Sequence, residues 1–188
     1  MDSKDDRAIV GTTMTDATVI ALIGHSAAGK SQCLKLLKLD RQAADMDVAW
    51  RIKKSPTFDQ CMDWLTDKSR PPVVVVSNHE EKLNAMHSAK LSEAATDLFN
   101  SIHFVYFKKS KDRLARHLNL LSAGGSVRCE AAKAYTLQHY DRFDSMFSDL
   151  ANEVVDCSSL TSAEVAKLVS HLSKQVLAER VRLYANNP

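Results

Sequence analysis

The sequence lacks the features that mark several large classes of protein. Its 188 residues include only five glycines and four prolines, and no segment is repetitive or of low complexity. Four cysteines occur without a C-x-x-C pair, so neither a zinc site nor a disulfide framework is expected. The net charge of +2 is too small to indicate nucleic-acid binding. No apolar run approaches the ~18 residues of a membrane span. These absences favour a cytoplasmic protein with reduced thiols.

One segment indicates a specific chemistry. Residues 24–31 read GHSAAGKS and fit the phosphate-loop pattern G-x-x-x-x-G-K-[ST], between an apolar run and a segment with helical spacing. Backbone N–H groups of such a loop bind phosphate oxygens. Lys30 can then reach the β- and γ-phosphates, and the Ser31 hydroxyl can ligate Mg²⁺. The alternative is a glycine-containing turn without a ligand. The residues expected to bind the nucleotide are Gly24, His25, Ser26, Ala27, Ala28, Gly29, Lys30, Ser31 and Gln32.

Short apolar runs alternate with segments of helical periodicity along the chain. The runs lie at 18–23, 73–77, 102–107 and 153–156. The helical patterns lie near 30–39, 57–67, 79–98, 110–122, 130–150 and 162–184. Nearly all-apolar strands between helices are typical of a parallel sheet covered on both faces. With a weaker fifth strand over 43–45, the sequence predicts an α/β protein. Its expected architecture is a three-layer α/β/α P-loop fold with a parallel, about five-stranded sheet.

Two carboxylates follow the phosphate-loop pattern at a suitable distance. Asp45 and Asp47 come 15 and 17 residues after Lys30, which leaves room for one helix and a returning strand. Side chains two apart on an extended segment face the same side, so both carboxylates could face one cleft. Asp45 would then hold Mg²⁺ through its waters, and Asp47 could accept the proton of an acceptor hydroxyl. The alternative is a D-x-D turn that caps the following helix.

The order of these motifs resembles a known family. A phosphate loop followed by DMDVA at 45–49 resembles the shikimate kinases, which belong to the P-loop kinases of the nucleoside-monophosphate-kinase type. Later segments match in order, and the resemblance covers about residues 18–172. They are the strand at 104–110 (V-V-Y-L in the family), the lid around 126–128 (R-P-L-L), and the R-x-P-L-Y…V-D ending at Arg142, Phe147 and 154–156.

The resemblance implies ATP-dependent phosphorylation of a small molecule. It implies that Arg128, on a lid of about residues 117–131, closes over the phosphates and neutralises charge on the transferring group. Arg142 corresponds to an arginine that holds the carboxylate of the acceptor in this family. The alternatives are a solvated loop arginine for Arg128 and, for Arg142, a helix surface with an ion pair to Asp141 or Asp144. The expected catalytic residues are Lys30, Asp47 and Arg128.

The acceptor side departs from the family pattern. The G-G-G turn after the third strand is replaced here by SNH at 77–79, so side chains enter that pocket. Only about 25 residues separate Asp47 from Val73, so the family's acceptor-binding insertion is shortened or missing. Arg51 is one of the basic residues that could substitute for it. The expected acceptor-binding residues are accordingly Asp47, Arg51, Asn78 and Arg142.

Two histidines follow predicted strands. His79 could hydrogen-bond an acceptor or act as a base near neutral pH, or it could simply cap the helix that begins at Glu80. His25 occupies a variable position of the loop, and its side chain is expected to face solvent.

The sequence therefore predicts an ATP-dependent kinase that transfers a phosphoryl group to a hydroxyl of a small polar metabolite. ATP and Mg²⁺ are the expected cofactors, with no nucleic-acid or membrane partner and a monomer or weak homodimer as the assembly. The alternative is a nucleotide-binding regulatory or interaction protein with a degenerate acceptor site. The expected organisation is a flexible leader at 1–16, a kinase domain at 17–178 and a tail at 179–188.

Overall fold

The computed structural model describes residues 17–49, 57–76, 79–92, 96–122 and 127–185. Its strands are β1 (Val19–Ile23), β2 (Val73–Val75), β3 (Ile102–Lys108) and β4 (Glu153–Asp156). They form one parallel sheet in the order β2-β1-β3-β4, in which Ala21 of β1 lies between Val74 and Phe104. The α/β class and the all-parallel sheet expected from the apolar runs are confirmed.

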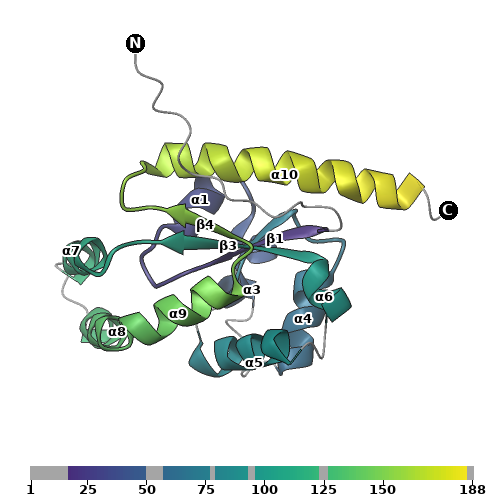
Figure 1. The fold of residues 1–188 in the computed structure, drawn as a ribbon. Coiled ribbons are helices and arrows are strands. Elements are labelled where there is room, and N and C mark those ends of the chain that lie inside the picture. The colour runs from purple at the N-terminus through teal and green to yellow at the C-terminus, as the bar shows by residue number, and fades with distance from the viewer. Residues whose placement is uncertain (1–16, 50–56, 77–78, 93–95, 123–126, 186–188) are drawn as a thin grey trace, which may run out of the picture.

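Helices connect successive strands and cover both faces of the sheet (Figure 1). They are α1 (Lys30–Leu36), α2 (Arg41–Ala44), α3 (Met46–Ala49), α4 (Phe58–Thr66), α5 (Glu80–Leu91), α6 (Thr96–Asn100), α7 (Lys111–Ser122), α8 (Val127–Gln138), α9 (Tyr140–Leu150) and α10 (Ser162–Ala185). Helices α1 and α10 lie over one face, and α4, α5 and α9 lie over the other. This arrangement gives three layers, as the buried strands require.

The alternating side chains of β1 divide the core between the two faces. Ala21 and Ile23 pack with apolar residues of α4, α5 and α9, whereas Ile20 and Leu22 pack with those of α1 and α10. All five residues of β1 are buried, because this strand lies inside the sheet with helices on each side. A strand buried on both faces carries no polar alternation, which is why its sequence reads as a continuous apolar run.

The fifth strand expected over 43–45 was a wrong prediction. Residues 41–44 form helix α2 instead, and the side chain of Asp40 caps it by accepting a hydrogen bond from Gln42 N at 3.1 Å. Asp45 alone forms a single parallel bridge with Val75. A capping aspartate before two alanines favours a helical turn over a strand. The described ranges therefore hold a four-stranded sheet.

The carboxyl ends of the parallel strands meet at one edge of the sheet. Helices α7 and α8 lie beyond the ends of β3 and β4 at that edge, while α10 extends toward the opposite edge (Figure 1). Near that opposite edge Arg180 of α10 donates hydrogen bonds to the carbonyl oxygens of Thr18 and Arg70. The boundary expected at 178/179 lies inside this helix. In the described part of the chain, none of the helices has the length and apolar character needed to cross a membrane.

Candidate functional site

The loop between β1 and α1 depends on two glycines for different reasons. Gly24 has φ of +140°, and a Cβ atom there would lie 2.8 Å from the carbonyl oxygen of Phe107 in β3. Gly29 has φ of +112°, but a Cβ atom there would meet nothing within 4 Å. A positive φ of this size suits glycine because it has no side chain to clash with the backbone. Glycine is therefore required at position 24 by backbone conformation and by packing, and at position 29 by conformation alone.

Lys30 places its ammonium group at the centre of this loop. Its side chain is buried, and Nζ donates to the carbonyl oxygens of Gly24 at 2.5 Å and His25 at 3.0 Å. Burial lowers the pKa of Lys30 to about 8, although the carboxylates of Asp47 and Asp45 act in the opposite direction. An ammonium group has three N–H donors, and two of them are used here. At neutral pH the loop thus carries a partly desolvated positive charge.

Asp45 is a buried carboxylate with three hydrogen-bond partners. Its Oδ2 accepts from the Ser31 hydroxyl at 3.3 Å and from the Arg41 guanidinium at 2.9 Å. Its Oδ1 accepts from the backbone N–H of Asp47 at 3.2 Å, in the first turn of α3. The helix-capping alternative for this pair is therefore correct for one oxygen of Asp45, while the other oxygen faces Ser31. Asp47 lies on a helix rather than on an extended segment, so the two-residue spacing argument was wrong.

Both carboxylates nevertheless line one cavity with the loop. The cavity has a volume of about 470 Å³ and is called here the Lys30 cavity. Its walls bring together most of the loop residues and both carboxylates expected from the sequence. It is lined by Ser26, Ala27, Ala28, Gly29, Lys30, Ser31, Gln32, Arg41, Asp45, Asp47, Val48, Val75, His117 and Leu121. Asp45 is buried in the wall, whereas the side chain of Asp47 is exposed.

A second cavity lies against the loop and is called here the Cys157 cavity. Its volume is about 300 Å³, and it shares Ala28, Gly29, Gln32 and His117 with the Lys30 cavity. Its further walls are Cys33, Phe107, Lys109, Cys157, Leu160, Ser162 and Val165. Lys109 fixes one edge, because its Nζ donates to Ala27 O at 3.4 Å and lies 3.2 Å from Nδ1 of His117. The two cavities are therefore neighbours across a common wall.

His25 corrects another expectation. Its side chain is only 2% exposed, and its imidazole stacks on the ring of Tyr140 with the ring centres 4.5 Å apart. The ring of Phe147 meets it edge-on at 5.2 Å. Burial, followed by the nearby charge of Lys30, lowers the pKa of His25 to about 4. Its side chain thus belongs to the aromatic packing of α9 rather than to solvent, while its backbone carbonyl holds Lys30.

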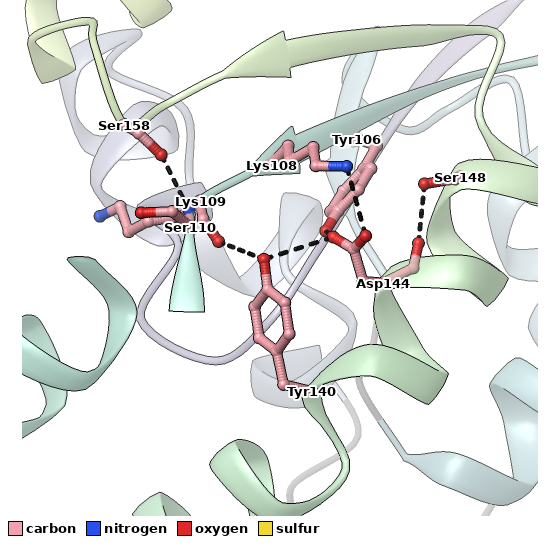
Figure 2. A network of polar contacts seen from close by, with 8 residues as sticks. All are labelled: Tyr106, Lys108, Lys109, Ser110, Tyr140, Asp144, Ser148 and Ser158. Carbon is pink, nitrogen blue, oxygen red and sulfur yellow. Dashed lines mark hydrogen bonds and ion pairs between the residues drawn. The ribbon is translucent and has the colours of Figure 1, made fainter. Parts of the chain in front are cut away.

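A polar network ties α9 to the end of β3 (Figure 2). Asp144 accepts from the Tyr106 hydroxyl at 2.5 Å and from Lys108 Nζ at 3.2 Å. Tyr140 donates to the carbonyl oxygen of Lys109 at 2.8 Å, immediately before α7. Burial alone would raise the pKa of Asp144, but the bonds from Tyr106 and Lys108 outweigh it and lower that pKa. Through Lys109 the network reaches the loop.

Arg142 lies outside both cavities. Its guanidinium pairs with Glu80 Oε1 at 2.5 Å and donates to Asn84 Oδ1 at 3.2 Å. The alternative partners Asp141 and Asp144 were wrong, since they pair with Lys111 and Lys108. Arg142, the arginine expected to hold the acceptor, is therefore engaged in a salt bridge between α5 and α9.

The remaining acceptor-side residues are placed only in part. Arg51 and Asn78 lie outside the described residues, so their predicted roles stay predictions. Arg128 belongs to the first turn of α8, and its side chain is outside the described part. The expected lid at 117–131 comprises the end of α7 and the start of α8, apart from residues 123–126, which are outside the described ranges. His79 precedes α5 without a capping hydrogen bond from its side chain.

Comparison with known proteins does not assign this chain to a family. Neither protein-family models nor curated proteins gave a match to this chain. Among the described residues, no group of three or more histidines, cysteines, aspartates or glutamates could hold a metal ion. A function must therefore be argued from the loop, the two carboxylates and the cavities beside them.

Sequence reasoning overlooked two residues of this site. Arg41 lines the Lys30 cavity and binds Asp45, and His117 stands on the wall that both cavities share. Arg41 could have been found from its i,i+4 spacing to Asp45, which allows an ion pair once the intervening residues form a helical turn. His117 gave no comparable signal, because its position depends on how α7 packs beside the loop.

Proposed function

We propose that this chain binds Mg²⁺·ATP at the 24–31 loop and transfers the γ-phosphoryl group to a hydroxyl of a small polar acceptor. The observation that carries the proposal is one cavity of about 470 Å³ that joins the Lys30 ammonium, the Ser31 hydroxyl and the carboxylates of Asp45 and Asp47. Phosphoryl transfer depends mainly on positioning and electrostatic stabilisation, and these groups supply both.

Lys30 and the loop backbone would bind the phosphates. The ammonium group now donates to two neutral carbonyl oxygens, and an anionic phosphate oxygen is a stronger acceptor for the same donors. An anion beside Lys30 favours its charged form, so binding would raise the pKa from about 8 and keep the group protonated. The loop sequence GHSAAGKS supports the same assignment.

The oxygen atoms of Ser31 and Asp45 fit a magnesium ion. The hydroxyl and Oδ2 lie 3.3 Å apart, and both are hard oxygen donors of the kind that Mg²⁺ prefers. Mg²⁺ commonly takes one or two protein ligands and keeps several waters, so a larger cluster is not required. Bound with the nucleotide, the ion would supply charge neutralisation on the phosphates.

The nucleoside would occupy the Cys157 cavity. This cavity shares Ala28 and Gly29 with the Lys30 cavity, so a ligand can extend from one to the other along the loop. Its walls combine apolar side chains such as Phe107 and Val165 with the polar edge formed by Lys109 and His117. Apolar walls combined with a few polar groups that can fix the orientation of a ligand are typical of small-molecule sites.

Asp47 is the proposed base for the acceptor. Its side chain is exposed, lies in the first turn of α3, and borders the same cavity as Lys30. A carboxylate there can accept the proton of an attacking hydroxyl when that hydroxyl lies within hydrogen-bond reach. Arg128 would add positive charge from the start of α8, as the resemblance implies. Asp47, Arg51 and Asn78 would contact the acceptor.

One observation favours a second candidate, a nucleotide-binding regulatory protein. Arg142, the residue expected to hold an acceptor carboxylate, is bound to Glu80 and Asn84 instead. A chain that had kept the nucleotide site and lost the acceptor site would show such an arrangement. The two candidates differ in whether bound ATP is turned over with an acceptor.

Calorimetry with ATP and an ADP-release assay test the proposal together. Lys30→Ala should abolish ATP binding, whereas the matched control Lys35→Ala, an exposed lysine of α1, should bind as the wild type does. Hydroxy acids, sugar acids and nucleoside monophosphates are then screened as acceptors. Asp47→Asn should bind ATP normally and lose acceptor-dependent turnover. Binding without turnover on any acceptor would favour the regulatory candidate, and equal binding by Lys30→Ala would refute both.

A further inference from the structure

Arg41 lies between the proposed metal site and solvent. It is the first residue of α2, and its Nη2 lies 2.9 Å from Oδ2 of Asp45. The arginine side chain is 52% exposed, while that of Asp45 is 4% exposed. Among the described residues, Asp45 is its one ion-pair partner. A half-exposed guanidinium is thus paired with a buried carboxylate.

Arg41 also borders two separate spaces. It lines the Lys30 cavity, and it lines an open groove of about 530 Å³ together with Lys35, Lys38 and Asp40. The half-exposed guanidinium thus lies at the border of the Lys30 cavity, where a phosphate bound in that cavity would be a competing partner. A planar guanidinium binds two phosphate oxygens at once, which makes phosphate a stronger partner than a single carboxylate oxygen.

The Asp45 carboxylate cannot satisfy two cations equally. Oδ1 is used by the N–H of Asp47, and Oδ2 is already shared by Ser31 and Arg41. A divalent ion at Ser31 and Asp45 would lie beside the Arg41 guanidinium, and like charges at such a short distance repel each other. The single negative charge of Asp45 cannot neutralise both the Arg41 guanidinium and a divalent ion.

We propose, on the basis of the function proposed above, that Arg41 exchanges partners when Mg²⁺·ATP binds. It holds Asp45 until the divalent ion arrives, and it then moves to the nucleotide phosphates in the same cavity. Arg41 opposes the divalent ion at Asp45 until a phosphate offers it another partner. Binding of the ion and binding of ATP are therefore coupled through this arginine, which acts as a further nucleotide-binding residue.

Titration of the full chain with Mn²⁺ without nucleotide tests the first half of the exchange. Arg41→Gln removes the competing charge, so Mn²⁺ should bind about fivefold more tightly, at the low end of usual coupling between ligands. Paramagnetic resonance of the free ion measures this binding. Arg41→Lys keeps the charge and should bind Mn²⁺ as the wild type does. The control Lys35→Gln removes a charge from the neighbouring groove and should also leave Mn²⁺ binding unchanged.

Calorimetry with ATP in excess Mg²⁺ tests the second half. Arg41→Gln should bind Mg²⁺·ATP about fivefold more weakly because its phosphate contact is lost. Thus one substitution should tighten the metal alone and weaken the metal–nucleotide complex, a pair of opposite changes that a merely destabilised site would not give. An unchanged value in either titration overturns the exchange. If wild-type chain binds no ATP at all, the proposed function fails, and that result is distinct from a failure confined to the Arg41 variants.

Discussion

Substitution of Gly24 by alanine should be far more damaging than the same change at Gly29. A non-glycine residue at φ of +140° or +112° costs about 1–3 kcal/mol in backbone strain. At Gly24 the new Cβ atom would also lie 2.8 Å from the carbonyl oxygen of Phe107, and relief of that overlap costs about 1–3 kcal/mol more. Gly29 has no such neighbour, so Gly29→Ala is a matched control for the strain alone.

Urea unfolding followed by far-ultraviolet circular dichroism measures both variants. Gly24→Ala should lose about 2–6 kcal/mol and Gly29→Ala about 1–3 kcal/mol of unfolding free energy. Each kcal/mol corresponds to a fall of about 2–4 °C in melting temperature for a chain of this size. Equal losses in the two variants would refute the close approach of the loop to β3. Loss of ATP binding in Gly24→Ala alone would show that this approach also positions Lys30.

The other predictions concern pH and the aromatic packing. The pKa of His25 is about 4 in the fold against 6.5 ordinarily, so the unfolded chain takes up the proton first and stability should fall by about 3 kcal/mol from pH 6.5 to pH 4. Lys30 has a pKa of about 8 against 10.5, so its contribution should rise by about 3 kcal/mol from pH 8 to pH 10.5. Lys30→Met should therefore flatten that alkaline rise and stabilise the chain at pH 7. Tyr140→Phe should cost about 1 kcal/mol, because the hydroxyl donates to the carbonyl of Lys109.

Each of these three predictions has its own control. His25→Phe keeps an aromatic ring in the stack, and it should remove most of the acid dependence in urea titrations at pH 7 and pH 4.5. A full acid dependence in that variant would contradict the assignment. Lys35→Met, on the exposed side of α1, should leave the alkaline slope as it is. For Tyr140→Phe the comparison is Tyr135→Phe, whose hydroxyl donates to Glu80 at an exposed position where water can replace the lost bond, so an equally large loss there would contradict the role of the less exposed Tyr140 bond.

Strands β1, β2 and β3 could be predicted because their residues are buried on both faces of the sheet. Such strands have no polar alternation and end where polar residues begin, so the runs at 18–23 and 102–107 marked β1 and β3. The loop glycines were equally visible, since their conformations exclude most other residues. Together these two signals place the loop directly after β1, at the carboxyl end of that strand.

The other features depended either on helix caps, which apolar periodicity does not reveal, or on contacts between elements. Asp40 caps α2 and thereby removes the expected strand, and Asp45 caps α3 and places Asp47 on a helix. The partner of Arg142 is Glu80 because α5 and α9 pack side by side, about sixty positions apart in the chain. His25 is buried because Tyr140 and Phe147 of α9 cover the loop. Sequence spacing describes one element at a time, whereas the contacts of Arg142 and His25 join different elements.

The position of α10 has a consequence for the order in which the chain can fold. Strand β1 lies near the start of the sequence, but its residues Ile20 and Leu22 pack against residues of α10, among them Val169 and Val176. Arg180 then ties the same helix to the backbone at Thr18. During synthesis, the face of the sheet that α1 and α10 cover cannot be fully buried until α10, the last described helix, has emerged. The 24–31 loop, although among the first segments made, thus gains its final support at the end of folding.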